Sequence, residues 1–132
     1  QISFPGGKVE ECDVNSLACA LREAQEEIGL PPENVEPLGY LDSYRTGTGF
    51  RIDPVVALVR PDFTLTLNAG EVADVFEVPL EFFLDPGNHR RHSDEVKGRL
   101  RRYYSMRYAD RNIWGATAGM LYTFYQILKD VS

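Results

Sequence analysis

The sequence predicts an α/β fold, and three segments carry that prediction. Residues 13–28 place apolar side chains at helical spacing, and Val55–Val59 is a short apolar run typical of a buried strand. A second helical pattern follows Gly115 and extends to Val131. A chain of 132 residues is long enough to bury one core, so we expect a single domain over residues 1–132.

Composition excludes several classes of protein. The net charge of −6 gives no sign of a nucleic-acid-binding surface. The sequence contains no run of 18 apolar residues, so it predicts no membrane span. Cys12 and Cys19 have a spacing that suits neither a metal site nor a disulfide. We therefore expect a protein of a reducing, cytoplasmic compartment that binds neither nucleic acid nor membrane.

Three glutamates gather on one side of the first predicted helix. At about 100° per residue, Glu26 and Glu27 fall within about 60° of Glu23, opposite the apolar stripe. Like charges at these spacings, near the negative end of the helix dipole, are unfavourable by about 1–3 kcal/mol in total. A divalent cation would offset this repulsion. The alternative is an acidic face that is merely solvated.

Signals at both ends bound this helix. The turn Phe4-Pro5-Gly6-Gly7 precedes it, and its two glycines allow positive φ and a close approach of the backbone to a ligand. Asp13 is the expected N-cap, with Asn15 or Ser16 as alternatives. Gly29 is the expected C′ residue, followed by Pro31-Pro32.

The rest of the chain predicts alternating strands and turns. We expect strands over residues 35–44 and 50–59 (the second one central), an edge strand over Phe63–Leu67, a strand over Val75–Val78, a short helix over 79–84, a polar loop over 86–95 with His89 and His92 at the surface, and a strand over 99–108.

Positive charge is concentrated late in the chain. Residues 90–111 hold eight of the fourteen cations and have a net charge of +5, against −11 for the remainder. Arg99, Arg101, Tyr103, Ser105 and Arg107 share one face of the predicted strand. Two interpretations stay open, a solvated strand face and a wall that attracts a phosphate-rich substrate.

Carboxylates are hard oxygen ligands, and Mg²⁺ or Mn²⁺ is the ion that matches them. Glu23, Glu26 and Glu27, with a carbonyl from the Gly-Gly turn, could hold such ions beside substrate phosphates. This chemistry suits attack by water on a diphosphate, with a further carboxylate as general base.

The order Gly7, Asp13 and Arg22-Glu23-Ala24-Gln25-Glu26-Glu27-Ile28-Gly29-Leu30 resembles the Nudix box. Asp13 stands where the motif has Glu, the following spacer is one residue longer, and Ala24 holds an aliphatic position. Within the family the chain resembles the coenzyme A diphosphatases, in the segments 1–8, 20–30 and 113–118 and at Glu71. Because that subfamily's signature begins upstream of Gln1, we expect an N-terminally truncated domain that lacks its first strands.

This resemblance implies a Nudix-type α/β/α sandwich with a mixed β-sheet and roles for individual residues. Glu23, Glu26, Glu27 and the Gly7 carbonyl would bind metal; Glu23, Glu27, Glu71 and Arg22 would be catalytic; Phe4, Arg45 and Arg51 would contact the substrate. The implied reaction cuts coenzyme A, or its thioesters, to 3′,5′-adenosine diphosphate and 4′-phosphopantetheine.

Two alternatives to this reaction stay open. One is hydrolysis of ADP-ribose or another nucleoside diphosphate derivative, and the other is an inactive nucleotide-binding fragment. In each case the expected partner is a small-molecule nucleotide. An exposed sheet edge could also be covered by a second copy of the chain, which would give a homodimer.

Overall fold

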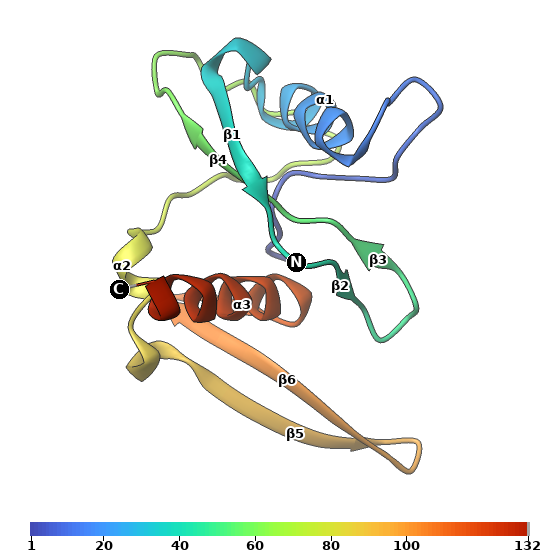
Figure 1. The fold of residues 1–132 in the computed structure, drawn as a ribbon, viewed down its shortest axis with the longest axis vertical. Coiled ribbons are helices and arrows are strands. Elements are labelled where there is room, and N and C mark those ends of the chain that lie inside the picture. The colour runs from blue at the N-terminus through green and yellow to red at the C-terminus, as the bar shows by residue number, and fades with distance from the viewer. Residues whose placement is uncertain (132) are drawn as a thin grey trace. The chain divides into compact units, whose positions relative to one another are not determined.

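The structure is a computed structural model that describes residues 1–131, and it divides into two compact units. The α1 unit comprises Phe4–Ser43 and Asp53–Phe76, and the α3 unit comprises Gln1–Ser3, Tyr44–Ile52 and the chain from Glu77 onward. Helices and strands occur in both, which confirms the α/β class (Figure 1). The expectation of a single domain stays a prediction.

Helix α1, Ser16–Ile28, begins at one of the alternative caps and ends where the sequence predicts. Asn15 is the N-cap, and its side-chain oxygen accepts a hydrogen bond of 2.8 Å from the Ala18 N–H. Asp13 as N-cap is wrong, because its carboxylate binds Arg22 instead. Gly29 ends the helix with φ of 74°, a left-handed conformation that favours glycine.

The predicted strand over 50–59 is interrupted at Pro54, and the predicted strand over 35–44 is interrupted as well. In the α1 unit, β1 (Val35–Tyr40) pairs antiparallel with β4 (Val55–Val59), and Figure 1 shows α1 beside this pair. The 3₁₀ turn Pro32–Asn34 joins α1 to β1. β4 is not the central buried strand we expected, because β1 is its partner in a two-stranded ladder and its last residues are exposed.

The two strands predicted after β4 are absent, and local hydrogen bonds explain why. In the segment Phe63–Leu67, the Thr66 N–H donates to the Ile28 carbonyl at 3.0 Å, which takes it out of any ladder. That carbonyl is one of the orphan acceptors at the end of α1. In Val75–Val78, the Val75 N–H donates to the carboxylate of Asp74 at 2.8 Å, a local bond that competes with sheet pairing.

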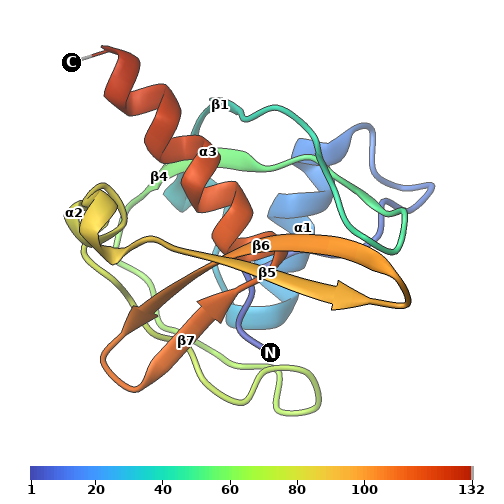
Figure 2. The ribbon, with the colours of Figure 1, turned by 90° about the horizontal axis from the view of Figure 1, so that it is seen from below.

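The α3 unit is built on an antiparallel three-stranded sheet. Its strands are β5 (Arg90–Val96), β6 (Arg99–Tyr108) and β7 (Arg111–Trp114), in that spatial order. Helix α3, Ala116–Val131, covers one face of this sheet (Figure 2), and it begins after Gly115 as predicted. Met106 and Ile113 from the sheet and Ala118 and Leu121 from the helix form the buried core.

Four smaller elements complete the α3 unit. The short helix α2, Leu80–Phe83, follows Pro79 as predicted, and the 3₁₀ turn Pro86–Asn88 comes next. β2 (Tyr44–Arg45) and β3 (Arg51–Ile52) form a separate two-stranded ladder. All the strand pairs among residues 1–131 are antiparallel. In the same part of the chain, none of the helices is long and apolar enough to span a membrane.

The polar loop predicted over 86–95 is wrong, since most of it is strand β5. Lys97 and Gly98 both have positive φ, 52° and 77°, and form a two-residue hairpin turn that returns the chain to β6. Polar residues are stable in β5 because every residue of β5 pairs with a residue of β6. One of these pairs is Asp94 opposite Arg101. His92 lies in β5 and not in a loop, and it stacks on Tyr103. His89 lies between the 3₁₀ turn and β5 and is half-buried, with a ring nitrogen 2.6 Å from the Phe83 carbonyl oxygen.

Met106 is 0% exposed, so Met106→Ala should lower the free energy of unfolding of the α3 unit by about 2–5 kcal/mol. Leu100→Ala is the matched control, because Leu100 lies on the same strand but is 61% exposed, and it should change stability by less than about 0.5 kcal/mol. Urea unfolding followed by the fluorescence of Trp114 measures both. Equal losses in the two variants would contradict this packing.

Candidate active site

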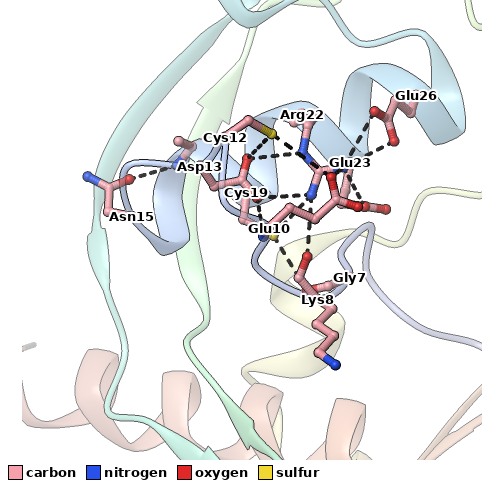
Figure 3. Close-up of polar contacts among 11 residues, drawn as sticks. Gly7, Lys8, Glu10, Cys12, Asp13, Asn15, Cys19, Arg22, Glu23 and Glu26 are labelled. Carbon is pink, nitrogen blue, oxygen red and sulfur yellow. Dashed lines mark hydrogen bonds and ion pairs between the residues drawn. The ribbon is translucent and has the colours of Figure 1, made fainter.

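Arg22 is the centre of the polar network on α1. Its guanidinium donates from Nε to Asp13 Oδ1 and from Nη2 to Asp13 Oδ2, both at 3.0 Å, a bidentate pairing. Nη1 donates to Glu23 at 2.8 Å, and Nη2 also donates to the Lys8 carbonyl at 3.3 Å. Figure 3 shows these groups turned toward the guanidinium. One side chain therefore ties the loop before α1 to the helix.

Asp13 is the strongest partner of Arg22. Its side chain is 3% exposed, and the hydrogen bonds from Arg22, followed by one from the Glu10 backbone, lower the pKa of Asp13 to about 2. The same pairing raises the pKa of Arg22. The ion pair is thus present throughout the neutral range.

Glu26 is placed differently from the other two glutamates of the cluster. Its side chain is 55% exposed and pairs with Arg22 at 3.3 Å, from the position one helical turn away. Glu23 is mostly buried. Glu23 and Glu26 therefore both contact Arg22 on one side of α1, but Glu26 is much more accessible to water than Glu23.

The Gly6-Gly7 turn lies against the glutamates of α1. The Gly6 N–H donates to Glu27 Oε1 at 2.9 Å. A Cβ added at Gly7 would lie 2.7 Å from the carboxyl carbon of Glu23, which is closer than real contacts allow. Neither glycine uses a positive φ, so the turn needs Gly7 for close approach alone. The Gly7 carbonyl, a predicted metal ligand, accepts a weak bond from the Cys19 thiol at 3.5 Å.

Glu27 has a raised pKa. Burial raises its pKa, the Gly6 N–H opposes that rise, and the negative charges of Glu23 and Glu71 add to it. Glu71 reaches this position through Asn68, whose N–H donates to the Glu27 carbonyl at 2.9 Å and whose carbonyl accepts from the Glu71 N–H at 2.9 Å. Glu23 and Glu71 are therefore both close enough for their charges to act on Glu27. A shared role of the three glutamates in catalysis stays a prediction.

These donors fit a divalent metal in kind. Within residues 1–131 no group of three His, Cys, Asp or Glu side chains is already arranged around a common metal position. Mg²⁺ commonly takes one or two carboxylates and completes its shell with water and substrate oxygens. Glu23 and Glu27 supply that number. Burial, and after it the charges of Glu23 and Glu71, raise the pKa of Glu27, and a nearby cation would stabilise the charged form of this carboxyl group. Metal binding stays a prediction.

The predicted substrate-binding residues lie in both units. Arg45 and Arg51 are directly opposite each other in the β2–β3 ladder of the α3 unit, which concentrates positive charge there. Phe4 is exposed at the start of the α1 unit. Their contact with a substrate stays a prediction.

Sequence reasoning missed three contributors to this site. Asp13 was expected to cap the helix, but it binds Arg22. The available signal for this role was that Asp13 matches the first acid of the Nudix box. The Gly6 N–H and the Asn68 backbone act through atoms that every residue has. No side-chain pattern could have singled them out.

The fold and the site together define an α/β protein with a glutamate-bearing helix packed against a Gly-Gly turn. The family model described as NUDIX domain matches residues 1–100, so the chain belongs to the Nudix family. It is 40% identical over 121 residues to proteins named uncharacterized Nudix hydrolase NudL from Cronobacter sakazakii and Citrobacter koseri, and 37% identical to the one from Escherichia coli K12. Each match covers 92% of this chain, which spans only about 63% of the length of these relatives.

Gly7→Ala should lower the free energy of unfolding by about 0.5–1.5 kcal/mol, because its methyl group would push the flexible end of Glu23 aside and weaken its hydrogen bond with Arg22. Gly6→Ala is the matched control, since a Cβ there meets nothing within 4 Å, and it should change stability by less than about 0.5 kcal/mol. Denaturant unfolding of both variants measures this. A Gly7→Ala protein as stable as Gly6→Ala would rule out the close approach.

The Asp13–Arg22 pair should make stability fall in acid. The folded-state pKa of Asp13 is about 2, below the ordinary 3.8, so its carboxylate contributes stability above pH 3.8 that is lost as the pH falls toward 2. The free energies of unfolding of the wild type and Asp13→Asn should therefore converge between about pH 5 and pH 2. Glu11→Gln, on the same loop, should show no such convergence. A wild-type advantage that is independent of pH would contradict the assignment.

Proposed function

We propose that the chain hydrolyses a diphosphate bond with the help of a divalent metal ion. The observation that carries this proposal is the cluster of Glu23, Glu27 and Glu71 beside the Gly6-Gly7 turn, in which Glu27 has a raised pKa. Carboxylates that repel one another in this way are stable neighbours once a cation lies between them. Membership of the Nudix family supports the same reaction class.

Glu23, Glu27 and the Gly7 carbonyl are the proposed ligands of Mg²⁺ or Mn²⁺, and Glu26 is a further one. Because Glu26 is exposed, leaving its ion pair with Arg22 would cost no more than about 1 kcal/mol. When bound, such a metal neutralises phosphate oxygens and lowers the pKa of an attacking water.

The remaining roles belong to the chain's own side chains. Arg22 positions Glu23 through their 2.8 Å hydrogen bond. Glu71 is proposed to accept a proton from the attacking water. The water oxygen bonds to phosphorus as the bridging P–O bond breaks. The leaving phosphate carries away the bond's electron pair.

Coenzyme A or one of its thioesters is the proposed substrate, and 3′,5′-adenosine diphosphate and 4′-phosphopantetheine the proposed products. The likeness of the segments 1–8, 20–30 and 113–118 to coenzyme A diphosphatases supports this choice. The relatives are named uncharacterized, and their names carry no substrate. The choice of coenzyme A therefore rests on the likeness of these segments, whereas the proposed reaction class rests on the family and on the glutamate cluster.

Release of 3′,5′-adenosine diphosphate from coenzyme A, measured with Mg²⁺, tests both the proposed reaction and the proposed substrate. Glu27→Gln should reduce the rate by about 100-fold or more, because it removes a charge that holds the metal, and EDTA should abolish turnover. Glu11→Gln, an acid-to-amide change on the exposed loop, should leave the rate within about twofold.

The other outcomes separate the alternatives. Faster hydrolysis of ADP-ribose than of coenzyme A would move the substrate to the nucleoside diphosphate derivatives. A thermal shift with coenzyme A and Mg²⁺ but no turnover would identify a nucleotide-binding module. Equal rates for the wild type and Glu27→Gln would overturn the mechanism.

A further inference from the structure

The outer face of the β5–β6–β7 sheet carries a hollow that is separate from the residues of the Nudix box. Its volume is about 500 Å³, within the range of small-molecule sites, and its lining comes from all three strands. The lining residues are Arg90, His92, Tyr103, Ser105, Arg107, Asn112 and Trp114. All of them belong to the α3 unit.

Strand register explains why the hollow exists. Ser105 lies at the centre of the face, opposite Arg90 on one side and Trp114 on the other. Its neighbours on the same face of β6 are the large residues Tyr103 and Arg107, two positions away in either direction. A small side chain surrounded by four long ones leaves a depression in the face of the sheet.

Aromatic rings form a preorganised wall on one side of this depression. His92 and Tyr103 stack with their centroids 4.8 Å apart and their planes 15° apart. Tyr103 meets Trp114 edge to face at 6.2 Å. The 2.6 Å contact of a His92 ring nitrogen with the buried Ser105 hydroxyl fixes the stack from below. Trp114 is 40% exposed, so part of this side chain is accessible to a ligand.

Cations stand at the rim of the hollow. Arg90 and Arg107 are exposed. Arg90 lies opposite Ser105 on β5, and Arg107 lies two positions after Ser105 on β6. None of the ion pairs found within residues 1–131 involves either arginine. Arginine is the side chain best suited to bind phosphate in a bidentate geometry. Asn112, opposite Arg107, adds an amide that can donate to and accept from a base edge.

We propose that this hollow binds a mononucleotide, with the base stacked on the aromatic wall and the phosphate held by Arg90 and Arg107. The combination of a planar wall and two cations fits a ligand that is both aromatic and anionic, and neither a sugar phosphate nor a neutral nucleoside satisfies both halves. This proposal does not depend on diphosphate hydrolysis, because binding here needs neither metal nor the box glutamates.

Trp114 is the chain's single tryptophan, so its fluorescence reports on the hollow directly. Titration with AMP in the presence of EDTA should quench this fluorescence, and adenosine and ribose 5-phosphate should each bind at least about tenfold more weakly. Calorimetric titration under the same conditions gives the stoichiometry, which should be one AMP per chain.

Charge-matched double variants test the two arginines. Arg90→Gln with Arg107→Gln should raise the AMP dissociation constant by at least about tenfold. Arg99→Gln with Arg101→Gln removes the same charge from the same face of β6, beyond Tyr103 and outside the hollow, and should raise it by less than about twofold. All four positions are exposed, so both proteins should fold, which circular dichroism checks.

Three results would overturn the proposal: no quenching by AMP, adenosine binding as tightly as AMP, or equal weakening in the two double variants. Glu27→Gln should bind AMP like the wild type. The fluorescence assay therefore separates this inference from the proposed hydrolysis, since either can fail while the other holds.

Discussion

The bidentate pairing of Arg22 with Asp13 is the constraint on which the candidate active site depends. Asp13 lies in the loop that follows the Gly6-Gly7 turn, and Arg22 lies in the middle of α1, so the pair closes that loop onto the helix. Arg22 contacts four carboxylates in all. One guanidinium cannot neutralise four negative charges, and the excess of negative charge supports the proposed cation site.

Closing the loop has a steric consequence. With the loop held down, the Gly7 backbone rests against the Glu23 carboxylate at a distance that leaves no room for a Cβ. The neighbouring Gly6 N–H is at the same time brought within hydrogen-bond reach of Glu27. A single ion pair thus positions both the turn and the glutamates, and the glycines of the motif are needed for space at Gly7 rather than for a left-handed backbone.

Much of this helix could be predicted from sequence, because its signals are local. Apolar spacing, Gly29 and the prolines after it determine α1 within a few residues, and the same holds for the start of α3 after Gly115. The strands were harder, since Phe63–Leu67 alternates like an edge strand. The Thr66 N–H of this segment instead donates to the Ile28 carbonyl left open at the end of α1, a long-range competition that no local pattern records.

Strand β5 shows the opposite error, in which a polar sequence forms a regular strand. Its pairing with β6 supplies the stability that its own side chains do not predict, and the two-residue turn at Lys97-Gly98 sets the register. That register brings Arg90, Ser105 and Trp114 into one row across the sheet. The pairing of β6 with its neighbours turns alternate residues of the predicted basic face into a hollow with two cations at its rim. A role of this face in binding phosphate stays a proposal. Sequence alone could place Arg107 and Ser105 on one face, but not the ring of Trp114 beside them.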